Sequence, residues 1–541
     1  MVNNRPGCAF GRVAAGQLLS LLRSTSHRQP CAFWYYACLT GIQAERGPES
    51  GICRPQAALF KKIEAMEGSI VKDLKFSILA LLAVMTIAGC GGSSSAPAQE
   101  KGTLAVVITD GPTDDFDRIL ITLERMLLIG GDGGHQIVYD GPSITFDLLD
   151  LRDRADFAFS GEIIADDYSK IRLVVSDVQL IDTDLPGSQP LVDLPANGKI
   201  DLNPQGPFTI AAGQTTVVEL DMDANRSFHV VEQGNGDYRL RPVIFVNVYA
   251  DDIILPSKLV RVFGTVDSVD DTGPERSVLL CSLHFAAQLG APVVTSDPTK
   301  CVRVFENAST SFFGEDGLAS NFGAVAAQDM LTGIGFLTAG APDVLFDLDA
   351  VVMEIGEHQP PSATGWETLR GLVGPDADCG IIPDAADSFC FLPVDAITPV
   401  KTQLQPTTRV LDSQGTILSH ADVQDTEAGI LDALRINNGD EEFLAALVVL
   451  SQNSGDEVIA GLLADVVPGD PYDFLLIDGM AVCVDEETDI LRILVDEDVV
   501  TIVDLIDPDV LEPGVDMVEA AGTPGEVGSS CDIVADVVIV E

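Results

Sequence analysis

Apolar and polar residues alternate in short stretches between residues 102 and 250, most clearly at Ile171–Val175 and Arg239–Val248. A period of two residues is typical of β-strands that bury one face. Turns rich in Gly, Pro and Asp separate these stretches. The pattern predicts strands at Thr103–Thr109, Arg118–Ile129, Gln136–Tyr139, Lys170–Asp177, Val178–Asp182, Phe208–Ile210, Thr215–Met222 and Tyr238–Val248.

Helical periodicity is nearly missing from the same region. One short helix is predicted around Phe146–Arg154, and no long amphipathic stretch occurs. Many short strands joined by tight turns favour two packed sheets. We therefore expect residues 102–250 to form a β-sandwich domain.

The rest of the chain contains an internal repeat. Three units each open with a strand that contains a glycine, at Gly264, Gly371 and Gly461. Each unit then has a second strand, which contains a cysteine, and ends on an apolar strand with an alanine. Units of this size, with about six strands, fit small closed β-barrels, which leave no strand edge exposed. We expect barrel-like repeats at 259–356, 368–451 and 458–541, and an all-β fold.

Six cysteines follow Cys90, and they fall into sequential pairs within the repeats. No C-x-x-C motif and no Cys/His zinc spacing occurs among them. In an exported protein this arrangement predicts three intradomain disulfides, each stabilising its unit by roughly 2–4 kcal/mol. The alternative is that some remain buried free thiols. The pairs are Cys281 with Cys301, Cys379 with Cys390, and Cys483 with Cys531.

Motifs along the first region carry a family likeness. They are Gly102-Thr103-Leu104, Thr109-Asp110-Gly111-Pro112, Asp147–Leu151, Tyr168–Asp177 and Leu240–Ile244. With them the region resembles a bacterial family of exported domains, domain of unknown function 4382, over nearly its whole length. The resemblance implies a β-sandwich module of lipid-anchored or secreted proteins. The family has no established activity, so a location and a fold are implied rather than a reaction.

The three repeats resemble a second exported family, the β-barrels of domain of unknown function 5666. On that barrel the cysteine pairs have distinct roles. The pair at residues 379 and 390 would close the first hairpin of the second unit. The pair at 281 and 301 would join strands two and three of the first unit. The pair at 483 and 531 would link an early strand to the last strand of the third unit.

A bacterial lipoprotein signal precedes these domains. The apolar run Phe76–Ala88 follows Lys72, Asp73 and Lys75 and ends close to Cys90. A transmembrane helix needs roughly 20 apolar residues, whereas a signal core needs about 7–15. We expect residues 66–89 to be the signal, Cys90 to carry the lipid, and residues 90–101 to be a Gly/Ser tether. The alternative is a buried helix with a chance cysteine.

Residues 1–65 do not fit a signal at the N-terminus. They are basic and contain four cysteines, in contrast with the acidic remainder of the chain. We expect translation to start near Met66 or at Val71. Residues 1–65 would then be an artefact of start-site assignment, and the alternative is a genuine disordered leader.

The chain is strongly acidic, with 83 Asp and Glu against 31 Lys and Arg and a net charge of −52. A field of this sign repels nucleic acid and anionic membrane surfaces. The hydrophobic content of 46% is ample for packed cores. We therefore expect no nucleic-acid partner, and contact with a membrane only through the lipid.

Signatures of known catalytic sites are missing. The sequence contains no nucleophile elbow, Walker A motif, dinucleotide fingerprint or H-E-x-x-H motif. The histidines after Cys90 are far apart and are expected at the surface or in turns: His135, His229, His284, His358 and His420. Trp366 is placed in a linker, and so few aromatic residues argue against a sugar-binding cleft.

One acidic cluster could hold calcium. Asp110, Asp114, Asp115 and Asp117 crowd a loop beside a strand end, where a hard cation would relieve their repulsion. The alternative is turn chemistry, in which Asp side chains bond their own backbone. No other cofactor is expected.

Together these observations indicate a lipid-anchored envelope protein of the binding, adhesion or structural type, not an enzyme. The outer membrane is favoured, because Gly91 rather than the retention residue aspartate follows Cys90. The alternatives are a calcium-binding stalk, or an enzyme or accessory protein with a site in acidic loops. Its protein or surface ligand is not identified by the sequence.

Overall fold

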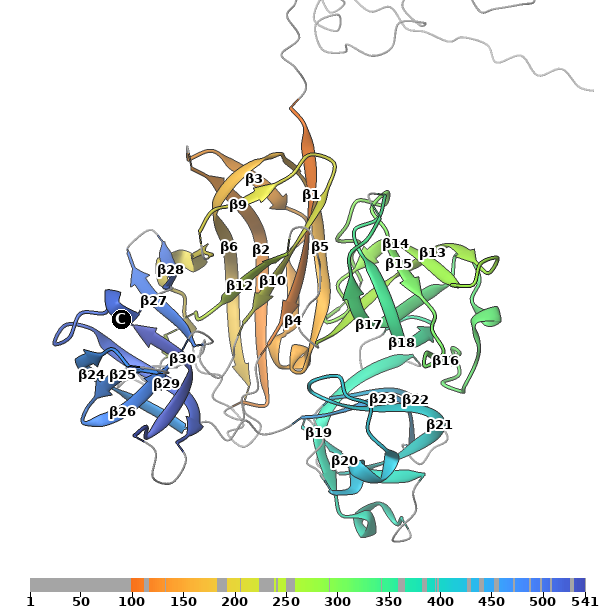
Figure 1. The fold of residues 1–541 in the computed structure, drawn as a ribbon. Coiled ribbons are helices and arrows are strands. Elements are labelled where there is room, and N and C mark those ends of the chain that lie inside the picture. Colours follow the sequence, from red (N-terminus) through yellow and green to blue (C-terminus); the bar gives the residue numbers. More distant parts are fainter. Residues whose placement is uncertain are drawn as a thin grey trace, which may run out of the picture. The chain divides into compact units, whose positions relative to one another are not determined.

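The computed structural model describes residues 99–540 except 111–115, 132, 182–191, 205, 223–237, 240–241, 250–257, 291, 342, 359–364, 382–386, 395, 397, 426–429, 437–441, 452–456, 470–471, 486–487, 497–498, 506–507 and 526–529. These residues belong to one compact unit, residues 97–541. Its regular elements are β-strands and short 3₁₀ helices (Figure 1). The predicted all-β class is therefore confirmed.

The first domain is a sandwich of two sheets. One sheet has the order β12-β10-β1-β5, in which β1 and β10 are parallel. The other has the order β8-β6-β2-β3, with β4 also beside β2 and β9 beside β6. The strands are β1 (Lys101–Thr109), β2 (Arg118–Gly130), β3 (His135–Tyr139), β4 (Ile144–Asp147), β5 (Arg154–Ile164), β6 (Asp166–Ile181), β8 (Lys199–Asn203), β9 (Phe208–Ile210), β10 (Thr215–Asp221) and β12 (Phe245–Tyr249).

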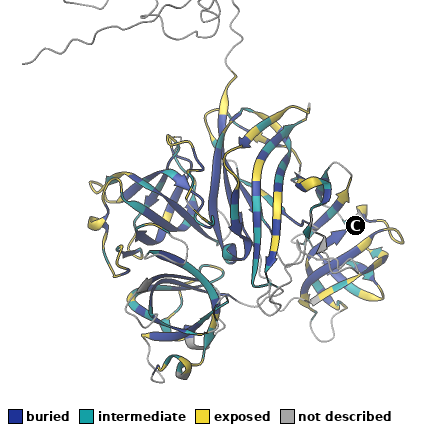
Figure 2. Cartoon of the chain, turned by 180° about the vertical axis from the view of Figure 1, so that it is seen from behind, coloured by how far each residue is buried: buried dark blue, intermediate teal, exposed yellow. Residues whose placement is uncertain are grey.

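Both sheets contribute to a common core. Leu104 and Phe159 from the first sheet and Ile121 and Leu173 from the second are buried in one cluster. Figure 2 shows buried and exposed positions alternating along long strands of this domain. The period-two pattern of the sequence therefore reports which side chains point into the core.

Several strands differ from the expectation. The predicted strands Lys170–Asp177 and Val178–Asp182 are one long strand, β6. The predicted strand Tyr238–Val248 is instead the short β11 (Tyr238–Arg239), which pairs with β7 (Val192–Asp193), and the separate β12. Pro242 lies between β11 and β12, and a proline cannot donate to a sheet ladder. The expected helix is a single 3₁₀ turn, η1 (Leu148–Leu151).

Three barrels follow the sandwich. The first contains β13 (Leu259–Asp270), β14 (Ser277–His284), β15 (Val302–Phe305), β16 (Ser311–Phe313), β17 (Met330–Thr338) and β18 (Asp347–Ile355). The second contains β19 (Trp366–Gly374), β20 (Ser388–Pro393), β21 (Val400–Asp412), β22 (Ile430–Ile436) and β23 (Glu442–Leu450). The third contains β24 (Glu457–Val467), β25 (Asp473–Ile477), β26 (Met480–Val484), β27 (Asp489–Val495), β28 (Val500–Leu505), β29 (Met517–Pro524) and β30 (Ile533–Val540).

The barrels share one strand order. Their closed rings are β13-β14-β15-β18-β17, β19-β20-β21-β23-β22 and β24-β25-β26-β30-β29. In each ring the third strand runs parallel to the last, and the other neighbours are antiparallel. A five-stranded ring in the order 1-2-3-5-4 is the arrangement of an OB-fold barrel. The internal repeat is therefore a repeat of one topology.

The glycine in the first strand of each unit has a steric reason, seen most clearly at Gly371 on β19. A Cβ atom there would lie 2.0 Å from the carbonyl oxygen of Leu392 on β20. No side chain fits this approach unless the backbone shifts, so the curved first hairpin of the second barrel requires glycine.

The last strand of each barrel is buried on both faces. On β23, Ala445 and Val448 point into the barrel, whereas Leu447 and Val449 join a second cluster that includes residues of the first barrel. On β30, Val537 and Ile539 join the core cluster of the sandwich. Double burial explains why these strands read as near-continuous apolar runs rather than alternating ones.

Strand pairing also joins the domains. Parallel pairing connects β5 of the sandwich to β13 of the first barrel, with Arg261 opposite Asp156. Parallel pairing likewise connects β8 to β28 of the third barrel. One edge of each sandwich sheet is therefore covered by a barrel strand.

All three predicted disulfides are present, Cys281–Cys301, Cys379–Cys390 and Cys483–Cys531. In the third barrel the cysteine lies on the third strand, β26, and not on the second.

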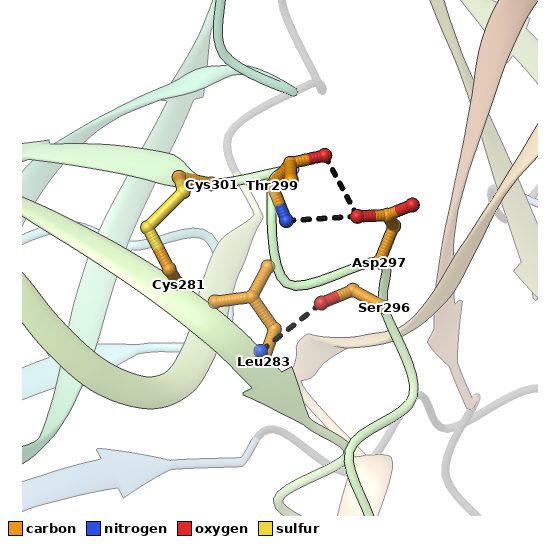
Figure 3. Close-up of a disulfide and its surroundings, with 6 residues drawn as sticks. All are labelled: Cys281, Leu283, Ser296, Asp297, Thr299 and Cys301. Carbon is orange, nitrogen blue, oxygen red and sulfur yellow. Dashed lines mark hydrogen bonds between the residues drawn. A yellow bond between two sulfur atoms is a disulfide. The ribbon is translucent and has the colours of Figure 1, made fainter. Parts of the chain in front are cut away.

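The first bridge closes the loop between β14 and β15 (Figure 3). Inside that loop Ser296 Oγ accepts a bond from the Leu283 amide at 3.0 Å. Asp297 Oδ1 accepts bonds from the amide and hydroxyl of Thr299 at 2.8 and 2.7 Å. A covalent link and local hydrogen bonds thus fix a connection that has little regular structure.

Candidate functional site

A buried network of charged side chains lies where the sandwich meets the first two barrels. Arg154 and Asp156 come from β5, and Arg261 comes from β13. Arg261 Nε donates to Asp156 Oδ1 at 2.8 Å, and its Nη2 reaches the other oxygen of the same carboxylate. Because the strands pair in register, this bidentate bond is a cross-strand contact.

The second barrel completes the network with Asp432 on β22 and Thr368 on β19. Arg154 Nη1 donates to Asp432 Oδ2 at 2.9 Å, and the Thr368 hydroxyl donates to Asp432 Oδ1 at 2.7 Å. Both arginines also donate to the Thr368 oxygen, at 3.1 and 2.7 Å. Two guanidinium groups and two carboxylates, none more than 1% exposed, thus balance in charge across three domains.

The charges of the network shape the pKa of Asp432. Burial alone would raise this pKa. The charges of Arg154 and Arg261, together with the bond from Thr368, outweigh burial and lower it to about 2. Asp432 is therefore ionised at neutral pH.

Glu354 and His358 adjoin the network from the end of the first barrel, 3.2 Å apart between Oε2 and Nε2. Burial, then the charge of Asp432, raises the pKa of Glu354 well above its usual value. Burial, then the charge of Arg261, lowers the pKa of His358 to about 3. Both shifts favour the neutral form of the group concerned.

A cavity of about 390 Å³ opens beside the network, within the size range of small-ligand pockets. All three domains line it. The sandwich contributes Arg118, Asp147 and Asp150. The first barrel contributes residues 285–290 and Pro292, which belong to the connection closed by the Cys281–Cys301 bridge. The second barrel contributes the start of β19, including Arg370, and the loop after β20.

Within the cavity, Asp147 is fully engaged. It accepts bonds from Arg118 Nε at 2.7 Å, the Ile119 amide at 3.1 Å and the Leu149 amide at 3.3 Å. The first bond is an ion pair, and the last caps η1. Asp147 is thus a structural residue that holds Arg118 at the cavity wall.

Asp150 and Arg370 are less constrained. Burial, then the charge of Asp147, raises the pKa of Asp150 to about 7, although Arg370, Arg118 and Arg154 oppose the shift. Arg370 Nη2 donates to the carbonyl of Asp117, and its Nε is buried without a hydrogen-bond partner. In the described part of the chain Arg370 forms no ion pair. The cavity therefore combines a carboxyl whose pKa is raised with a guanidinium that forms no ion pair among the described residues.

Most of the sandwich is similar to a known family. Residues 101–242 match the model of the family described as Domain of unknown function (DUF4382). We call this part of the chain the DUF4382 module, after the family to which it is similar. No curated protein matches the chain. The DUF4382 module supplies Arg154 and Asp156 to the network and Arg118, Asp147 and Asp150 to the cavity.

Only two of the four aspartates predicted to bind calcium lie in the described part of the DUF4382 module. Asp110, at the end of β1, is 2% exposed, and Asp117 lies just before β2. Asp114 and Asp115 lie outside the described residues, as does Cys90. Among described residues no group of three His, Cys, Asp or Glu side chains is arranged to hold a metal, and no helix is long and apolar enough to span a membrane.

Two expectations about aromatic and imidazole side chains were wrong. Trp366 does not lie in a linker. It begins β19, is 1% exposed and donates from Nε1 to the Ile355 carbonyl at 2.9 Å. His284 and His358 are not surface or turn residues. His284 is buried on β14, and the His358 side chain is buried against Glu354.

Sequence reasoning also missed the network. Its members are single charges within apolar strands, as in Leu259-Val260-Arg261-Val262-Phe263 and Ile430-Leu431-Asp432-Ala433-Leu434. A lone charge in such a run is a usable signal, because buried charges are almost always paired. The residue that pairs with such a charge cannot be predicted from the same run, since it comes from another domain.

Proposed function

We propose that this protein is exported, is anchored to the cell envelope by lipid at Cys90, and acts there by non-catalytic binding, adhesion or structural support. The observation that carries the proposal is one disulfide in each barrel. Lasting disulfides are typical of exported proteins. The signal pattern before Cys90 supports the lipid anchor, and Gly91 after it favours the outer membrane.

The joined domains support a binding or structural role. Strand pairing and the buried network tie the DUF4382 module to its barrels, so loops of three domains are held around one cavity. A preorganised frame of this kind favours recognition, because little conformational freedom is lost on binding.

Metabolic labelling with a radioactive fatty acid tests the anchor. We expect label in the wild-type protein, none in Cys90→Ser, and recovery of the wild-type protein in the membrane fraction. Peptide mapping of the cell product should find no peptide from residues 1–60. An unlabelled, soluble protein with reduced thiols would exclude the proposal.

We also propose that the three barrels are related to the family of domain of unknown function 5666. Their common strand order supports this relation, together with the glycine in each first strand. A profile built from one barrel should recover the other two and members of that family. If it recovers neither, the proposed relation is wrong.

One observation favours the alternative of an enzyme with an acidic site. The pKa of Asp150 is raised to about 7, which suits a general acid or base, and Asp150 lines the cavity. Turnover of a substrate that is lost in Asp150→Asn, with folding intact, would establish this alternative. For the calcium-binding stalk, Asp110 and Asp117 remain candidates. Thermal melts with calcium and with chelator would coincide if the stalk needs no metal.

A further inference from the structure

The geometry points to the three-domain cavity as a binding site for a small monocarboxylate with a compact apolar body, held at its charged end by Arg370. This inference deepens the binding role proposed above and rests on it. Free organic acids and the C-terminus of an apolar peptide share this chemistry.

The charge at the site argues for an anion. In a chain with 83 acidic and 31 basic residues, three arginines line one cavity, Arg118, Arg261 and Arg370. The first is paired with Asp147, and the second with Asp156. Arg370 forms no ion pair among the described residues, so its guanidinium has no carboxylate in direct contact and can bind one from a ligand.

The hydrogen bonding at Arg370 points the same way. Its Nε is buried and lacks a partner. A buried donor that is left unsatisfied is destabilising, because it has lost its hydrogen bond to water. A carboxylate is the acceptor that fits a guanidinium fork best, and its binding would relieve this cost.

The neighbouring carboxyl groups limit the charge of the ligand. Asp147 and Glu367 also line the cavity, so the second negative charge of a phosphate monoester would meet repulsion. Asp150, with its pKa near 7, can offer an O–H to a carboxylate once it is protonated. The site therefore suits a ligand with one negative charge and disfavours a ligand with two.

The remaining walls are apolar. Phe285 and Leu289 from the first barrel, and Pro393 and Val394 from the second, line the cavity. Burial of an alkyl or aryl group against them removes apolar surface from water and so adds to affinity. The ligand therefore needs an apolar body as well as a charged end.

Calorimetric titration of the full-length protein with 3-phenylpropanoate tests the inference, with 3-phenylpropanamide as the uncharged match. We expect the acid to bind at least ten times more tightly than the amide. Arg370→Gln should remove that preference, whereas Arg276→Gln, at an exposed pair with Glu306, should leave it unchanged. Equal binding of acid and amide, or binding of neither, would overturn the inference.

The pH dependence of binding gives a second test. Asp150 faces Asp147, Arg118, Arg154 and Arg370, so its protonation is set within the site. Affinity for 3-phenylpropanoate should fall as the pH rises from 6 to 8 in the wild type but not in Asp150→Asn. A pH dependence that Asp150→Asn keeps unchanged would contradict this role for Asp150.

Two further measurements complete the test of the binding site. If Arg370→Gln does not fold, Val394→Phe adds bulk at a residue that lines the cavity without changing any charge, and it should abolish binding. Retained binding in that folded variant would overturn the assignment. A short apolar peptide with a free C-terminus, compared with its amide, distinguishes a peptide end from a free acid. Failure of these titrations would leave the fatty-acid labelling result unaffected, so the two proposals are tested separately.

Discussion

Removal of one charge from the buried network should destabilise the protein strongly. In Asp432→Asn the carboxylate that binds Arg154 at 2.9 Å is lost, while both arginines remain buried. The pKa of Asp432, lowered from 3.8 to about 2, corresponds to about 2 kcal/mol of net stabilisation of its charged form. The loss should be larger, at about 3–5 kcal/mol, because the variant also leaves a guanidinium unpaired.

A double-mutant cycle separates the pair from its surroundings. Arg154→Leu alone should also destabilise the protein. Asp432 would then keep the Arg261 charge, 3.8 Å away and without a hydrogen bond, and the bond from Thr368. The double variant removes one charge of each sign and leaves the rest balanced. We expect it to recover at least about 2 kcal/mol relative to the sum of the single effects.

The assay is denaturant unfolding followed by tryptophan fluorescence. The chain has two tryptophans, so a Trp34→Phe background leaves Trp366 as the single probe. Trp366 is buried in the cluster shared by the first two barrels and reports on this junction. Lys101→Met, at an exposed pair with Glu162, is the control and should change stability by less than about 1 kcal/mol. A loss below about 1 kcal/mol in Asp432→Asn, or additive effects in the cycle, would refute the reasoning.

Three further outcomes follow from the fold. The pKa of His358 is lowered to about 3, so the unfolded chain takes up this proton before the folded chain does as the pH falls. The free energy of unfolding should therefore drop between about pH 6.5 and 3. Denaturant midpoints plotted against pH should change less over this range in His358→Gln. Gly371→Ala should lower the free energy of unfolding by about 1–3 kcal/mol through overpacking, measured by denaturant titration. In Gly374→Ala the new Cβ would meet no atom closer than 3.8 Å, so the loss should be less than about 1 kcal/mol. Replacing Cys483 and Cys531 by serine opens a link across 48 residues and should lower stability by about 2–4 kcal/mol in calorimetry; an unchanged melting temperature would show that the bridge does not constrain the unfolded chain.

The strands were predictable because their signal is local. Alternation along β2 and β6, and the glycine and alanine markers of the repeats, depend only on which face of a strand is buried. The cysteine pairing was predictable because the cysteines are few and sequential.

The candidate site was not predictable for the opposite reason. Arg154 and Asp432 are 278 positions apart, and their contact depends on how two domains pack. The sequence predicts Trp366 in a linker. This prediction is wrong because the burial of Trp366 comes from a neighbouring barrel. Interpretation of one strand at a time cannot supply such long-range contacts.

The outward faces of the last barrel strands determine where this chain can be divided. Val537 and Ile539 of β30, with Leu491 and Val500 of the preceding hairpin, belong to the same apolar cluster as the interior of the DUF4382 module. A fragment that stops after residue 451 would leave those contacts open to water and would release the β8 edge that β28 covers. The segment boundaries so visible in the sequence are thus poor sites for truncation, because the third barrel covers an apolar face and a strand edge of the first domain.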